Sequence, residues 1–61
     1  MKATIDQISL DHKTMKYMLY LNYCGNQNRI GITHDEAASI IESGDCDIVI
    51  HEKKTFWIPK P

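Results

Sequence analysis

The chain has 61 residues, of which 43% are hydrophobic and 25% are charged, and its formal net charge is −1. This composition is typical of a folded globular protein and excludes a largely disordered chain. A nearly neutral chain has no bulk electrostatic attraction to nucleic acid or to an anionic membrane. No apolar run approaches the roughly 20 residues of a membrane span, and the start MKATIDQIS lacks the apolar segment of a signal peptide. We therefore expect a soluble, cytoplasmic protein.

The length predicts a single domain over residues 1–61 with a small hydrophobic core. Domains of this size often depend on a disulfide, a metal or a partner for stability. The two cysteines are Cys24 and Cys46, and without a secretion signal we expect both to be reduced thiols.

The first half of the chain predicts three strands. TIDQISL (4–10) alternates only in part, but we interpret it as a strand because DHKT then forms a polar loop into MKYMLYLNY (15–23). CGNQN follows as a turn. RIGIT (29–33) is a short strand, in which Gly31 predicts a bulge or a close backbone approach.

The clearest local signal is the segment THDE, which fits a capping box with Thr33 at the N-cap and Glu36 three residues later. An apolar stripe at helical spacing follows, and Gly44 is placed to end the helix. The stripe consists of Ala37, Ala38, Ile40 and Ile41.

Two further strands complete the pattern, CDIVIHE (46–52) and FWIPK (56–60), joined by a turn at KKT. The order β-β-β-α-β-β predicts an α+β protein, a single two-layer domain with one short helix packed on an antiparallel sheet. We expect the helix to cover an inner set of apolar residues: Leu19, Leu21, Ile30, Ile32, Ile40, Ile41, Ile48, Ile50, Phe56 and Ile58.

One helix covers only one face of a sheet, so the opposite face is the candidate partner-binding surface. The residues expected there are Met18, Tyr20, Val49, His51 and Trp57. Apolar patches of this kind mark interaction sites, and Trp, Tyr and Met are enriched in interfaces. The alternatives are that these residues are scattered, since a one-residue register slip swaps the faces, or that the termini cover them. The same face could pair with itself in a homodimer, and the edge strand FWIPK could extend a partner's sheet.

Motifs for chemistry are weak. The sequence has no C-x-x-C and no H-x-x-x-H pair, which argues against a metal site, and no glycine-rich phosphate loop. A catalytic pair of Cys24 with His51 or His34 is conceivable, but nothing indicates the pocket that it would need. We therefore expect no enzyme activity and no cofactor.

Charged residues suggest two other surfaces. An acidic surface around the helix, able to occupy a basic groove, would comprise Asp35, Glu36, Glu42, Asp45 and Asp47. Single-stranded nucleic acid could instead stack on Tyr20 and Trp57 beside basic residues. The basic residues are Lys2, Lys13, Lys16, Arg29, Lys53, Lys54 and Lys60.

The segment GITHDEAASIIESGDCDIVIHEKKTFWIP is similar in its strand–helix–strand–turn–strand order to some small antitoxins, which carry a similar Glu-Ala, here Glu36-Ala37, near the helix start. The chain departs from them in its shorter helix and in the hairpin before it, so no function is carried over. In size it resembles the accessory proteins of phages and mobile elements, which commonly bind one larger protein. We expect a non-catalytic protein-binding inhibitor or adaptor, with a nucleic-acid-binding module or a homodimeric structural domain as alternatives.

Overall fold

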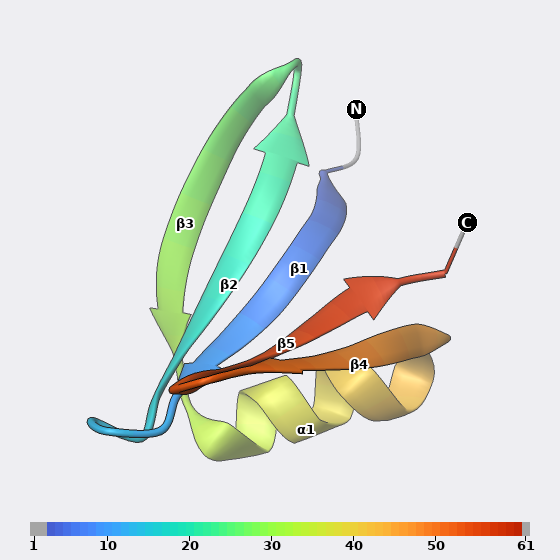
Figure 1. Cartoon of the computed structure of the whole chain (residues 1–61). Coiled ribbons are helices and arrows are strands. Elements are labelled where there is room, and N and C mark those ends of the chain that lie inside the picture. Colours follow the sequence, from blue (N-terminus) through green and yellow to red (C-terminus); the bar gives the residue numbers. More distant parts are fainter. Residues whose placement is uncertain (1–2, 61) are drawn as a thin grey trace.

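The computed structural model describes residues 3–60, which form five strands and one helix (Figure 1). The α+β class and the order β-β-β-α-β-β are both confirmed. The elements are β1 (Thr4–Asp11), β2 (Lys16–Tyr23), β3 (Asn26–Ile32), α1 (His34–Ser43), β4 (Cys46–His51) and β5 (Lys54–Pro59).

The strands form one antiparallel sheet in the order β3-β2-β1-β5-β4, so β1 is central and β3 and β4 are the two edges. Helix α1 follows β3 and precedes β4 in the chain, and it therefore has to carry the backbone from one edge of the sheet to the other. It does so across one face, as Figure 1 shows. We call this side the helix face and the other side the open face.

Tight turns set the register of two hairpins. Cys24 and Gly25 have φ of 53° and 81°, the paired positive values of a two-residue hairpin turn. Tyr23 therefore pairs with Asn26, and β3 begins three residues earlier than the sequence indicated. Glu52 likewise has a φ of 49° in the two-residue connection that lets His51 pair with Lys54.

The bulge in the sheet lies in β1 and not at Gly31. The register shifts between Ile5 and Gln7, which inserts Asp6 as an extra residue. Gly31 pairs regularly with Met18, and no atom lies within 4 Å of the position that a Cβ would take. The expectation for Gly31 was therefore wrong.

The capping box at the start of α1 is confirmed. Thr33 Oγ1 accepts a hydrogen bond from the Glu36 backbone N–H at 3.2 Å, and Glu36 Oε1 accepts one from the Thr33 backbone N–H at 3.1 Å. The helix ends at Ser43, and Gly44 has the extended φ of −123°, which leads the chain directly into β4. None of the helices in residues 3–60 has the length and apolarity needed to cross a membrane.

The core is small and sits under the helix. Three hydrophobic side chains are buried among the described residues, Ile8, Leu19 and Ala37. A ring of partly buried residues packs against them: Tyr17, Leu21, Ile32, Ile40, Ile41 and Trp57. Ile5 and Ile8 are three residues apart, a spacing that suits a helix, yet the bulge at Asp6 places both on the helix face of a strand.

The expected inner set is wrong for β5. Trp57 stands opposite Ile8 on one side and Ile48 on the other, so it belongs to the helix face. Phe56 and Ile58 alternate with Trp57 and therefore lie on the open face. The short β4–β5 turn fixes this register, whereas the sequence pattern alone allowed a slip of one residue.

The helix covers only the centre of its face. Ile30 on β3 and Ile48 and Ile50 on β4 share the helix face with the core, yet they are 49%, 64% and 70% exposed. They were expected to be inner residues, but α1 does not reach the two edge strands well enough to bury them.

The register of β5 predicts unequal costs for two truncations on this strand. We expect Trp57→Ala to lower the free energy of unfolding by about 3 kcal/mol, because it removes a large, partly buried side chain that packs against the core. Ile58→Ala should cost less than about 1 kcal/mol, because Ile58 is 40% exposed on the open face. Urea denaturation followed by far-UV circular dichroism measures both, and an equal loss would show that the register is wrong.

Candidate protein-binding surface

An apolar row crosses the open face. Ser9 on β1 pairs with Met18 on β2 and with Phe56 on β5, and Phe56 pairs with Val49 on β4. Directly paired residues lie side by side on one face, so Met18, Phe56 and Val49 form a band on either side of the buried Ser9. No other element among residues 3–60 lies over this band, because α1 occupies the opposite face.

A second row adds Tyr20 and Ile58 to the band. Tyr20 stands between Arg29 on β3 and Gln7 on β1, and Ile58 stands opposite Asp47 on β4. A shallow hollow of about 170 Å³ is lined by Tyr20 together with Gln27, Asn28 and Arg29. This side of the band therefore combines apolar surface with a cation and an anion.

A charged row borders the other side of the band. Asp11 pairs with Lys16 on β2 and with Lys54 on β5, and Lys54 pairs with His51 on β4. Opposite charges at directly paired positions support the sheet. The apolar band is thus framed by charges of both signs.

The carboxylate of Asp11 is also held by the loop that follows it. Asp11 Oδ1 accepts hydrogen bonds from the backbone N–H of Lys13 at 2.9 Å and of Thr14 at 3.4 Å. The bond from Lys13 makes the largest contribution, and with the charges of Lys54 and Lys13 it lowers the pKa of Asp11 from its ordinary value.

Four of the five residues expected at the partner-binding face lie on it: Met18, Tyr20, Val49 and His51. Trp57 does not, because it packs on the helix face against the core. Phe56 and Ile58 take its place, and sequence reasoning missed both. The signal that could have found them is the two-residue connection between paired His51 and Lys54, which determines the face of every residue in β5.

The five acids of the expected acidic surface do not form one cluster. Asp35 and Glu36 lie in the first turn of α1, whereas Asp45 follows its end, about 15 Å away along a ten-residue helix. Asp47 lies on the open face, with its Oδ1 at 3.9 Å from Lys60 Nζ. The remaining acid, Glu42, is exposed near the end of the helix.

Glu36 is engaged in the helix itself. Its carboxylate accepts hydrogen bonds from the Thr33 backbone N–H and from Thr33 Oγ1, the latter at 3.0 Å. Both bonds lower the pKa of Glu36 from its ordinary value, and the bond from the Thr33 backbone N–H has the larger effect. This acid therefore has a structural role at the N-terminus of α1.

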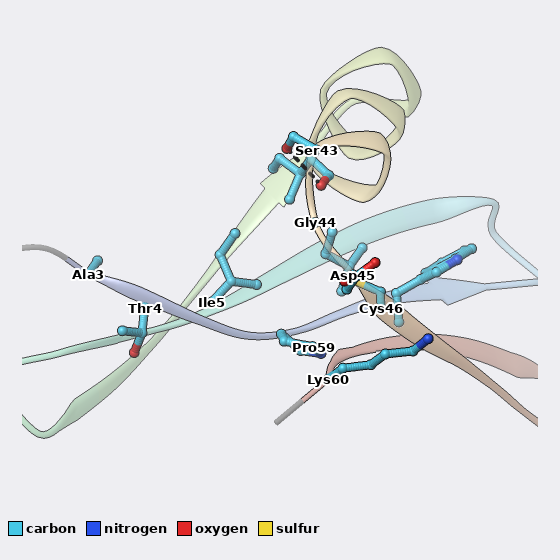
Figure 2. Close-up of a pocket in the computed structure, with 12 residues that line it drawn as sticks. Ala3, Thr4, Ile5, Ser43, Gly44, Asp45, Cys46, Pro59 and Lys60 are labelled. Carbon is cyan, nitrogen blue, oxygen red and sulfur yellow. Dashed lines mark hydrogen bonds between the residues drawn. The ribbon is translucent and has the colours of Figure 1, made fainter.

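A groove opens on the helix face, between the start of β1, the end of α1 and the end of β5 (Figure 2). Its volume is about 480 Å³. Ile5, Ile8, Ile40 and Trp57 are among its apolar lining residues, and Asp45 and Lys60 add charge. The groove shows that α1 leaves part of the helix face of the sheet uncovered near the C-terminal end of the helix.

An aromatic contact fixes the other end of the helix. The Tyr17 hydroxyl lies 2.9 Å from His34 Nδ1, at the first residue of α1, with ring centroids 5.5 Å apart. Tyr17 also stacks on Trp57 at a centroid distance of 6.1 Å. These three side chains connect the helix to β2 and β5.

The structure does not bring the candidate catalytic residues together. Cys24 lies in the β2–β3 turn, and His34 follows the opposite end of β3, a seven-residue strand of about 23 Å. His51 also lies at that opposite end, since it precedes the β4–β5 turn, and Cys46 starts the far edge strand. In the part of the chain that the structure describes, no three His, Cys, Asp or Glu side chains gather as metal ligands.

The basic residues of the two loops share one end of the sheet. The His12 backbone N–H donates to the Lys53 carbonyl oxygen at 2.9 Å, which joins the β1–β2 loop to the β4–β5 turn. Lys13 and Lys54 flank this contact. Lys2 lies outside the described residues.

Comparison of the chain with protein-family models, with curated proteins and with solved structures gave no match.

The lowered pKa of Asp11 predicts a pH-dependent contribution to stability. Because the folded pKa is below the unfolded one, the contribution is present above the unfolded pKa and is lost as pH falls through the folded pKa. We expect Asp11→Asn to have a lower Tm than the wild type at pH 7, and the difference in Tm to shrink as the pH falls through the folded pKa of Asp11. Thermal unfolding over this pH range, with Glu52→Gln as the control for loss of one charge, measures this; a constant difference would contradict it.

Proposed function

We propose that the chain is a small non-catalytic protein-binding module, of the inhibitor or adaptor kind encoded by phages and mobile elements, and that it acts in the cytoplasm. The observation that supports this proposal is the apolar band of Met18, Phe56 and Val49, with Tyr20 and Ile58 beside it, on a face that no described element covers. A folded antiparallel sheet usually presents polar residues on its solvent face.

The chemistry of this face suits a protein partner. Aromatic side chains and Met provide contact area at the centre of interfaces, and charged residues at the rim set orientation more than affinity. Here Lys16, Asp11 and Lys54 border one side of the band, and Arg29 and Asp47 border the other. The matching partner surface is therefore a flat apolar patch framed by charges of both signs.

A matched pair of truncations tests the face. Ile58→Ala removes an isoleucine that is 40% exposed on the open face, and Ile30→Ala removes one that is 49% exposed on the helix face. We expect Tyr20→Ala and Ile58→Ala each to weaken binding of a purified partner by about tenfold or more, as central interface residues do. Ile30→Ala should leave the affinity within about twofold of the wild type.

The partner is first captured from a lysate of the source cells on immobilised protein, then purified and titrated by calorimetry against the three variants. Far-UV circular dichroism verifies that each variant is folded. The open face would be excluded as the binding surface if Ile58→Ala and Ile30→Ala lost the same amount of partner affinity. It would also be excluded if the captured proteins bound all folded variants equally.

Single-stranded nucleic acid is a second candidate, favoured by the pairing of Tyr20 with Arg29 beside the hollow on β2 and β3. An aromatic ring next to a cation is a usual platform for a stacked base. This function predicts oligonucleotide affinity that falls with salt, with a slope of about −0.7 for each phosphate contacted. Fluorescence anisotropy with labelled oligothymidine measures it. Arg29→Gln should reduce the slope, and binding that does not respond to salt would exclude this candidate.

A further inference from the structure

Strand β4 has an unusual pattern for the edge of a sheet. Its sequence is CDIVIH, and the central Ile48, Val49 and Ile50 place apolar side chains on both faces. Strands that are apolar on both sides are normally interior strands, covered above and below and paired at both edges. Within residues 3–60, β4 is paired along one edge, with β5, and its other edge is unpaired.

These side chains are open to solvent. Ile48 and Ile50 are 64% and 70% exposed on the helix face, and Val49 is 43% exposed on the open face. An exposed apolar edge strand is a template for pairing with another strand, and proteins usually protect such edges with charged or polar residues. The other edge, β3, is protected in this way, since its sequence is NQNRIGI.

The exposed area is of the size that one more interface would bury. The chain exposes 4742 Å² for a mass of 7.0 kDa. A compact monomer of that mass exposes about 4,000 Å², so the excess is roughly 700 Å². This is close to the ~800 Å² that each partner contributes to a standard stable interface.

We infer that β4 pairs with β4 of a second copy of this chain, antiparallel and across a two-fold axis at Val49. In this register Ile48 stands opposite the partner's Ile50, and Val49 stands opposite the partner's Val49. The flanking residues of β4 are complementary as well, since Asp47 stands opposite the partner's His51. Two-fold symmetry makes each pair that lies off the axis occur twice, and the Val49 pair lies on the axis.

Neighbouring symmetric registers fit worse. Directly opposed residues lie on the same face of the sheet. A symmetric pair can therefore shift its register only by two residues at a time. A step in one direction places Val49 opposite Asp47 and Ile50 opposite Cys46. A step in the other direction places Val49 opposite His51 and Ile48 opposite Glu52. Each step sets apolar residues against polar or charged ones, so the register centred on Val49 is favoured.

The charge order of β4 identifies a second copy as the occupant. Within β4, Asp47 precedes the apolar centre and His51 follows it. A strand that is acidic at one end and basic at the other is its own antiparallel complement. An unrelated strand would need the same charge order by coincidence.

The resulting dimer has a continuous sheet of ten strands, five from each copy, with both helices on the same face. Ile48 and Ile50 of the two copies form a four-residue apolar cluster on the helix face, outside the reach of α1. On the open face the two apolar bands meet at Val49. The dimer therefore doubles the proposed binding surface and leaves it exposed, and the inference does not depend on that proposed function.

Solution mass is the first test. Light scattering after size exclusion should give twice the 7.0 kDa of one chain at high concentration, and the mass should fall on dilution. A monomer at every concentration would overturn the inference, and it would leave the proposed open-face function intact.

Charge variants test the register. Asp47→Lys removes both Asp47–His51 pairs, and His51→Glu places two anions opposite each other, so each variant alone should weaken the dimer by about tenfold or more. An equal mixture should form a heterodimer, because one cross-pair then joins a lysine to a glutamate and the other restores the Asp47–His51 pair. Glu42→Lys, the same change in charge on the exposed side of α1, is the control and should leave the dimer unchanged.

A disulfide test covers the case in which the charge effects are small. In a Cys24→Ser, Cys46→Ser background, Val49→Cys should form a linked dimer on mild oxidation, because residues on the two-fold axis have Cα atoms about 5 Å apart. Ile30→Cys, on the other edge strand, should not. A dimer that forms without linkage at position 49 and without a response to Asp47→Lys would overturn the inference and assign the interface to another surface.

Discussion

The whole structure depends on one helix that has to cross the sheet. The sheet order puts β3 and β4 at opposite edges, and α1 is the only element that links them within residues 3–60. A ten-residue helix of about 15 Å covers the middle of a five-stranded sheet and cannot cover both edges. The core is therefore restricted to Ile8, Leu19, Ala37 and their immediate neighbours, and apolar surface remains outside it.

Two-residue turns determine how that remaining surface is divided. Positive φ values at Cys24, Gly25 and Glu52 allow both turns to be only two residues long. Strand pairing therefore starts at the residues on either side of each turn, in β2–β3 and in β4–β5. Register then decides which face every side chain takes. This is why Trp57 anchors the helix face through Tyr17 and Ile8, and why Phe56 joins Met18 and Val49 on the open face.

The two edge strands of the sheet differ in the polarity of their side chains, and this difference affects how readily each edge pairs with another strand. Polar residues occupy the first four positions of β3, and its two isoleucines both lie on the helix face, whereas β4 carries isoleucine and valine on both faces. A polar edge discourages pairing, and an apolar edge invites it. The apolar band of the open face and the apolar edge strand lie next to each other at Val49, so association at the edge and docking on the face can coexist on one small protein.

The sequence by itself determined the local structure. The capping box at Thr33 and Glu36 fixed the helix start, and alternation placed Met18, Tyr20 and Val49 on one face and Leu19 and Leu21 on the other. Only the tertiary structure decided the strand order, the bulge at Asp6 and the face of Trp57. Caps and alternation depend on neighbours in the chain, so sequence shows them. Strand order and register depend on pairing between residues far apart in the chain, which the local pattern does not show. Alternation shows which residues of a strand share a face, but it does not show which face the helix will cover.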